Sequence, residues 1–356
     1  MSMKLLQRAS AAVKDKKSIY LAKVGRKKGF RNPDLEAAVI KTTSHDESFI
    51  DYKNAQRVFD WVRASPAFLK PLIWALTNRV DKTHNWVVAL KSLLLLHVVF
   101  STHIPATRMI GRLPFDLSAF HDRSSGPTKS SGYNAFIQAY FAFLDLHSTF
   151  LSYYREEEQQ QQQQHEESQT LMKKSLLRLH RSQELLDLLL QIKPCTDGME
   201  VGLVLEAMDC IVLEIFHVYN EIYDDVTSVV GMIASEATPE AVEALEILQK
   251  VAVQGSKVEG SMKVCREMGI VNARELPPIR RIREEDLCEA ERRIVGNEDV
   301  GGVVEEKGES GEEAGGMKME QHKGGGKWKE ELRNVFGTTV TESWVVFNDE
   351  LPVLWI

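Results

Sequence analysis

The residue types that carry out acid–base and nucleophilic chemistry are present, but their spacing matches no catalytic motif. The ten histidines are dispersed, and neighbouring acids such as Asp224–Asp225 lie in or beside helical patterns without a partner histidine. A general acid or base must lie within hydrogen-bond reach of the proton that it transfers, and neighbouring groups must tune its pKa. The chain has no Gly-rich phosphate loop, G-x-S-x-G elbow or H-E-x-x-H motif. We therefore predict that it is not an enzyme and that it holds no cofactor.

The four cysteines also argue against a metal site. Cys195, Cys210, Cys265 and Cys288 form no C-x-x-C pair. Two of them lie in apolar helical patterns, where a reduced cysteine packs as a small hydrophobic residue. We expect a reducing compartment and no zinc site.

No membrane-spanning or leader segment is expected. The first residues include no continuous apolar run, and the most apolar stretch, residues 86–100, is interrupted by Lys91, Ser92 and His97. That stretch is also too short to cross a bilayer. We predict a cytoplasmic protein whose membrane contacts are peripheral.

Charge is distributed unevenly along the chain. Residues 1–31 hold ten Lys or Arg and a single acid, Asp15, for roughly +9. Residues 284–356 hold eighteen acids and eight bases, for roughly −10. A basic beginning indicates an anionic partner, and an acidic end favours an extended, self-repelling segment. Because the basic segment has no recognition-helix signature or zinc spacing, we expect no nucleic-acid partner.

Helical periodicity dominates the rest of the chain and strand patterns are scarce. The segment 84–100 is apolar on several faces, which predicts a central helix. We expect an all-α fold, a helical solenoid of consecutive helices with short connections. The predicted helices cover residues 56–63, 68–77, 84–100, 136–154, 171–192, 200–235 and 239–268.

Three segments depart from this pattern. Residues 120–132 are rich in Ser and Gly and are predicted to form a loop. Residues 155–168 form an acidic, glutamine-rich insert, expected to be a solvated loop or helix extension. From about Gly296 onward Gly and charged residues dominate, and we predict disorder because little apolar area can be buried. We expect a helical domain at 1–283 and an acidic tail at 284–356.

Four blocks, in order, resemble the plant ANTH proteins, the clathrin assembly proteins related to CALM. The first spans residues 11–48 and includes AVKD, LAKV, DLE and SHDE. The second is NWVVALKSLLLLH at 85–97, and the third is FDLSAF at 115–120 with a tyrosine-rich helix after it. The fourth covers 240–268 and ends in the Leu276-Pro277-Pro278 exit. The resemblance implies a helical solenoid whose basic end binds phosphatidylinositol 4,5-bisphosphate or a related lipid.

The resemblance also places the headgroup site. The family motif opens with Lys-Ala-Thr and a His, which Lys41-Thr42-Thr43 and His45 match. It closes with Pro-Lys-x-Lys-His, which falls on residues 50–54, so that only Lys53 matches. The predicted headgroup residues are therefore Lys41, His45 and Lys53.

An aspartate, Asp51, stands where the family motif has a lysine, and it would repel a phosphate. An auxiliary basic patch could compensate by attracting anionic lipid. The patch consists of Lys23, Arg26, Lys27, Lys28 and Arg31. The alternative is that these residues belong to an ordinary solvated loop. Lys91 matches a family lysine, and we expect its stem to be buried and its ammonium exposed or paired.

The tail contains a short motif of the kind that anchors a side chain in a partner's pocket. Trp344-Val345-Val346-Phe347 resembles the W-V-x-F peptide bound by the clathrin adaptor appendage, and Trp344 and Phe347 would be its anchors. A tail segment packed back on the domain is the alternative.

The resemblance implies a phosphoinositide-containing membrane, clathrin and a vesicle SNARE as partners. It also implies a place at clathrin-coated pits and vesicles and at the Golgi. The alternative function is a soluble helical scaffold of the same fold, with a degraded lipid site, that acts by binding proteins.

Overall fold

The structure is a computed structural model of the chain. It describes residues 3–24, 31–48, 50–102, 104–161, 168–194, 198–233 and 240–296. Within these ranges the regular elements are helices and no strand occurs, so the predicted all-α class is confirmed. The part of the tail for which disorder was predicted, beyond Gly296, lies outside the described residues.

The first half of the described chain consists of five α-helices and two short 3-10 helices. In chain order they are α1 (Met3–Val24), α2 (Pro33–Thr42), α3 (Tyr52–Ala64), η1 (Pro66–Phe68), α4 (Leu69–Val80), α5 (Trp86–Ser101) and η2 (Pro105–Met109). The second half of the described chain contains six helices, four of which have 22–35 residues. These are α6 (Pro127–Gln161), α7 (Ser168–Leu189), α8 (Gly202–Ile233), α9 (Glu240–Glu267), α10 (Val271–Glu275) and α11 (Glu284–Gly296).

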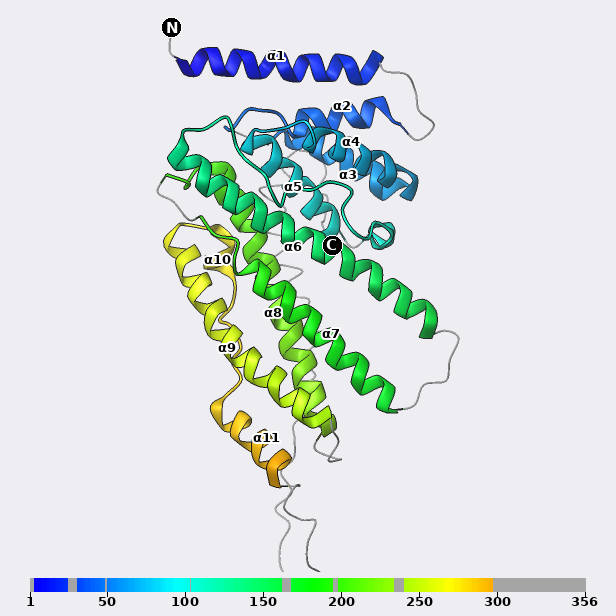
Figure 1. Cartoon of the computed structure of the whole chain (residues 1–356), viewed down its shortest axis with the longest axis vertical. Coiled ribbons are helices and arrows are strands. Elements are labelled where there is room, and N and C mark those ends of the chain that lie inside the picture. The colour runs from blue at the N-terminus through cyan, green and yellow to red at the C-terminus, as the bar shows by residue number, and fades with distance from the viewer. Residues whose placement is uncertain are drawn as a thin grey trace, which may run out of the picture.

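Neighbours in sequence are largely neighbours in space. α1 packs on α2, α2 on α3 and α4, and α4 on α5. The series continues from α5 to α6 and α8, and then through α7, α8 and α9 to α11. Figure 1 shows α1 lying across one end of the elongated molecule and α11 at the other end. The predicted solenoid is confirmed.

α5 is the centre of the fold, as its apolar sequence predicts. Fourteen of its residues are buried, from Trp86 to Phe100. Its first turn is capped by Asn85, whose side-chain oxygen accepts hydrogen bonds from the backbone N–H groups of Val87 and Val88. The indole of Trp86 stacks on the ring of Tyr133 with centroids 4.0 Å apart, which joins α5 to α6.

α6 begins inside the segment that was predicted to be a loop, and for residues 127–132 that prediction is wrong. Pro127 suits the first turn of a helix because the N–H it lacks would be unbonded there. The backbone N–H groups of Lys129 and Ser130 donate to the carbonyl of Gly126, and the Ser130 hydroxyl donates to the carbonyl of Asp122. These contacts offset the low helix propensity of Ser and Gly.

The segment that follows α10 is bound along α8 by Arg280. Its guanidinium donates to Asn220 and to the carboxylate of Asp224, and it lies 4.4 Å from the ring centre of Tyr223. In return the Tyr219 hydroxyl donates to the Arg280 carbonyl at 2.8 Å. α11 then packs against α9, where Gln249 donates to Glu291. The helix starts at the residue after the predicted domain boundary at 283.

Of the described helices, none combines the length and the apolar character that crossing a bilayer requires.

Candidate functional site

The predicted headgroup residues lie at the end of the solenoid that α1 crosses. A groove of about 450 Å³ opens there between α1 and the connection from α2 to α3. The groove is lined by Ala11, Ala12, Asp15, Lys16, Ile19, Lys41, Ser44, His45, Asp46 and Asp51. Another hollow, of about 300 Å³ between α7 and α9, contains none of the predicted residues.

The structure brings two of the three predicted residues into this groove. Lys41 is exposed in the last turn of α2, where its ammonium complements the negative end of the helix dipole. The start of α2 is fixed by its N-cap Asn32, whose side-chain oxygen accepts hydrogen bonds from the backbone N–H groups of Asp34 and Leu35. Lys53 is exposed in the first turn of α3 and is not part of the groove lining.

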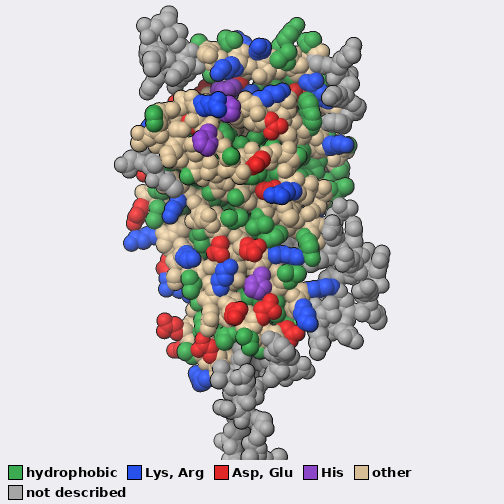
Figure 2. All heavy atoms as spheres, viewed as in Figure 1, with side chains coloured by type: hydrophobic (Ala, Val, Ile, Leu, Met, Phe, Trp, Pro, Cys, Tyr) green, Lys and Arg blue, Asp and Glu red, His purple; other side chains and the backbone are tan. Residues whose placement is uncertain are grey.

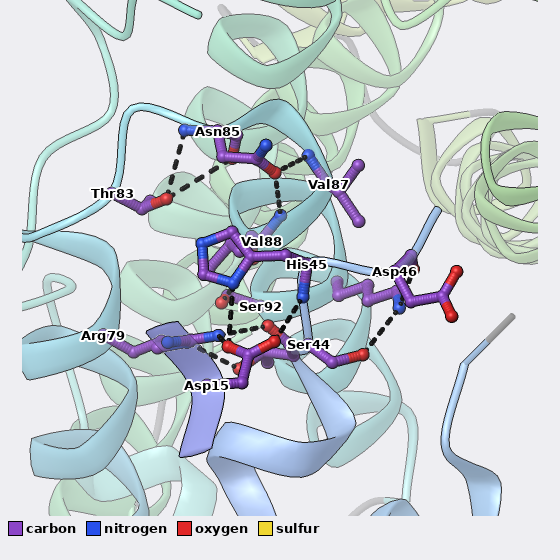
Figure 3. Close-up of polar contacts among 12 residues, drawn as sticks. Asp15, Ser44, His45, Asp46, Arg79, Thr83, Asn85, Val87, Val88 and Ser92 are labelled. Atoms are coloured by element: carbon purple, nitrogen blue, oxygen red, sulfur yellow. Dashed lines mark hydrogen bonds and ion pairs between the residues drawn. The ribbon is translucent and has the colours of Figure 1, made fainter. Parts of the chain in front are cut away.

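His45 is bonded to an acid on α1. Its ring Nδ1 lies 2.8 Å from Asp15 Oδ1, and its backbone N–H donates to Asp15 Oδ2 at 3.0 Å. Arg79 of α4 donates to the same carboxylate at 2.6 Å and to the carbonyl of Thr43 at 2.8 Å. Figure 3 shows these contacts converging on Asp15. Burial opposes ionisation of Asp15, but hydrogen bonds from His45 and Arg79 prevail and lower its pKa.

Lys91 of α5 contacts two of the residues that line the groove, Ser44 and Asp46. Its stem is buried in α5, and its ammonium donates to the Asp46 carbonyl at 2.5 Å and to the Ser44 hydroxyl at 3.3 Å. The expectation of a buried stem and a paired head is therefore confirmed. Burial lowers the pKa of Lys91 to about 8, although nearby carboxylates, chiefly Asp46, oppose the shift.

The aspartate that departs from the family motif has a local structural role. Asp51 is the N-cap of α3, and its carboxylate accepts from the backbone N–H and the side-chain amide of Asn54. An acid at the start of a helix is favourable because it bonds free N–H groups and faces the positive end of the dipole. The same carboxylate lines the groove.

The described members of the auxiliary patch differ in their surroundings. Lys23 is exposed in the last turn of α1. Arg31 is partly buried: it pairs with Glu36 at 2.7 Å and its guanidinium lies 5.0 Å from the ring centre of Trp74. It therefore fastens the start of α2 to α4. Arg26, Lys27 and Lys28 lie outside the described residues, as do Trp344 and Phe347.

The outward face of α1 carries a surface that was not predicted. Val13, Tyr20 and Val24 are 65%, 64% and 63% exposed, and the spacing of seven and four residues places them on one side of the helix. Lysines flank this stripe; the exposed ones are Lys14, Lys16, Lys17 and Lys23. Figure 2 shows apolar and basic side chains side by side on α1, at the top of the view. The helical period in residues 13–24 could have indicated this surface.

Asp15 and Arg79 are site residues that were also not predicted. Asp15 could have been singled out, because it is the one acid among the first 31 residues. Arg79 had no comparable signal, since it is 64 positions from Asp15 in sequence.

Comparisons with known proteins agree with this architecture. The ANTH domain profile matches residues 34–294. "Putative clathrin assembly protein At1g25240" of Arabidopsis thaliana is 45% identical over 298 residues, which cover 83% of this chain and 78% of that protein. "Putative clathrin assembly protein At1g68110" of the same plant is 39% identical over 354 residues, which cover 98% of this chain and 89% of that protein. The chain therefore belongs to the ANTH domain family.

Proposed function

We propose that this chain is a peripheral membrane adaptor that binds phosphoinositides and takes part in assembling clathrin coats. The observation that carries the membrane part is the end of the solenoid formed by α1, where a lysine-flanked apolar stripe lies beside the groove that holds Lys41. The coat part rests on membership of the ANTH family and on the names of the relatives.

The surface of α1 has the composition of a helix that rests at a lipid interface. Each lysine near an anionic leaflet is worth about 1 kcal/mol, and the effect is screened by salt. The exposed tyrosine and valines add apolar area that can enter the headgroup region. Lys41 and Lys53 then supply ammonium donors for a phosphorylated headgroup, with His45 as the third predicted member of the site.

Vesicle co-sedimentation tests the lipid site. The chain should sediment with vesicles containing phosphatidylinositol 4,5-bisphosphate, and Lys41→Glu and Lys53→Glu should each weaken binding by roughly tenfold. Lys257→Glu on the exposed face of α9 makes the same charge change away from α1 and is the matched control. If the site variants bind as the control does, the assignment of Lys41 and Lys53 is wrong.

The face of α1 can be tested separately from the headgroup site. Exchange of Tyr20 and Val24 for serine removes apolar contact without changing charge. The double variant should bind less tightly by a similar factor at low and at high salt, because salt screens the lysines but not the apolar contact. Unchanged affinity at both salt concentrations would contradict a role for the stripe in membrane contact.

Recruitment of coat proteins is proposed through the tail. Trp344 and Phe347 are the proposed anchors for the clathrin adaptor appendage, and a vesicle SNARE is a further proposed partner, at coated pits and vesicles or at the Golgi. In pull-down with the full chain, Trp344→Ala should abolish capture of the appendage and leave vesicle binding unchanged. Capture that survives this substitution would exclude the motif.

A soluble scaffold without lipid binding is the second candidate. One observation favours it: three carboxylates, those of Asp15, Asp46 and Asp51, line the groove and repel phosphate. Absence of sedimentation with any anionic vesicle, together with capture of coat proteins, would identify the chain as such a scaffold.

A further inference from the structure

Asp15 occupies a set of donors that would suit a phosphate. Its carboxylate receives the backbone N–H of His45, the ring of His45 and the guanidinium of Arg79 at 2.6–3.0 Å. All three side chains are shielded, with exposures of 14% for Asp15 and His45 and 10% for Arg79. A backbone N–H, an imidazole and a guanidinium together are typical donors to a phosphate oxygen. Here an acid from α1 fills them (Figure 3).

The other two acids of the groove make different contacts. Asp46 accepts from the backbone N–H and hydroxyl of Ser48, and Asp51 caps α3. Asp15 is the groove acid whose carboxylate bonds to the backbone N–H and the ring of His45 and to Arg79. Asp15 and His45 both line the groove, so a ligand beside Lys41 would meet this pair directly.

We propose that Asp15 is a built-in competitor for the inositol phosphate of the ligand and that it sets the affinity of the groove. The inference rests on the proposed lipid function. While Asp15 holds the backbone N–H and the ring Nδ1 of His45, a phosphate in the groove is attracted by the lysines and repelled by the carboxylate. When the Asp15 charge is removed, the imidazole and N–H of His45 become donors to the phosphate.

The test is Asp15→Asn in the full chain. Asparagine keeps an acceptor oxygen for Arg79, so α1 has a bond that can hold it in place, while the repelling charge is lost. Affinity should rise about tenfold. His45→Ala should lower the affinity by a clearly larger factor in the Asp15→Asn background than in the wild type, and it should remove the gain that Asp15→Asn gives. Such dependence on a second residue is what a shared phosphate predicts and general charge does not.

Asp46→Asn is the matched control, because it removes one charge from the same groove and leaves in place the bonds that Asp15 makes with His45. It should tighten binding only about two- to threefold. An equal gain from both variants, or a gain that survives His45→Ala, would overturn the proposal. The gain in affinity would then be a general effect of removing negative charge from the groove.

Two probes separate a lipid headgroup from a free inositol phosphate. Titration calorimetry uses soluble inositol 1,4,5-trisphosphate, and sedimentation uses phosphatidylserine vesicles with and without phosphatidylinositol 4,5-bisphosphate at equal total charge. A His45-dependent rise in the affinity of Asp15→Asn for either phosphate-bearing probe supports the proposal. If the affinity rises in both assays, the lipid is one source of the phosphate and the free inositol phosphate is the other. An equal gain on vesicles without the phosphoinositide would overturn the proposal.

Folding is checked by hydrogen exchange of the α1 amides, and Asp15→Ser serves as a second neutral variant. Loss of α1 protection in both variants would make Asp15 a structural clamp and overturn the proposal. If only the Asp15→Asn chain binds, the inference stands and the proposed function of the native sequence fails. If the wild type binds through Lys41 and Asp15→Asn changes nothing, the function stands and the inference fails. If neither chain binds, both fail.

Discussion

Replacing Lys91 with methionine removes a charge that the fold buries beneath the connection from α2 to α3. Lys91 is 1% exposed. Burial lowers the pKa of its ammonium from the ordinary 10.5 to about 8. Methionine has a similar length and cannot be charged, so the variant should keep the packing of α5 and lose the titration and the polar contacts of the ammonium, those to Ser44 and Asp46 among them.

The expected magnitude follows from the pKa in the two states. Between pH 8 and pH 10.5 the unfolded chain keeps a proton on Lys91 that the folded chain has released. The free energy of unfolding therefore rises with pH, by about 1.4 kcal/mol per pH unit from this residue and by about 3 kcal/mol over the window. Below pH 8 both states are protonated and this contribution is constant.

The assay is urea unfolding of wild type and Lys91→Met at several pH values from neutral to about pH 10. At pH 7 the lost hydrogen bonds oppose the relief of buried charge, so a single measurement decides little. Instead, the free energy of unfolding of the wild type should rise relative to that of Lys91→Met by roughly 2–3 kcal/mol between neutral pH and pH 10. A difference that stays constant with pH, at equal denaturant slopes, would refute the assignment of a depressed pKa to Lys91.

Three further substitutions test the packing and the buried charges. Asn85→Ala removes the cap of α5 and should cost about 1 kcal/mol in urea unfolding, whereas Asn85→Asp, which can still cap, should cost much less. Gly255→Ala would place a Cβ 2.5 Å from the Tyr219 hydroxyl and should destabilise the fold by about 1–3 kcal/mol; Gly260→Ala, with open space around it, should not. Burial opposes ionisation of Glu214, but a hydrogen bond from His97 and nearby histidine charges lower its pKa to about 2. The wild type should therefore lose free energy of unfolding relative to Glu214→Gln as the pH falls from about 4.5 toward 2. Acid unfolding curves of the two proteins that run parallel would contradict this.

The central helix was predictable because its signal is local. The apolar residues of 84–100 cover most of a helical circumference, and the structure buries them accordingly. The start of α6 was not predictable from composition, because the residues that stabilise it, Gly126 and Asp122, act through specific hydrogen bonds. Propensity alone assigns Ser and Gly to a loop.

The candidate site was predictable in part. The family motif predicts Lys41 and His45 as headgroup residues, and both line one groove. The bonding of His45 was not predictable, because it depends on an acid 30 positions earlier and on how α1 docks. Asp51 was expected only to repel a ligand, whereas the need for a cap on α3 explains an acid at that position.

The contacts of Arg280 have a mechanical consequence for the whole protein. Because this side chain ties residues 276–283 to α8, the chain is led to α11 and reaches Gly296 at the end of the molecule opposite α1 (Figure 1). α8 alone has 32 residues, and a helix of that size is about 48 Å long. The packed helices thus keep the end that bears α1 apart from Gly296, the residue to which residues 297–356 are joined. Removing the Arg280 contacts would loosen the hold of α8 on residues 276–283 and so leave the position of Gly296 less fixed, without altering the end that bears α1.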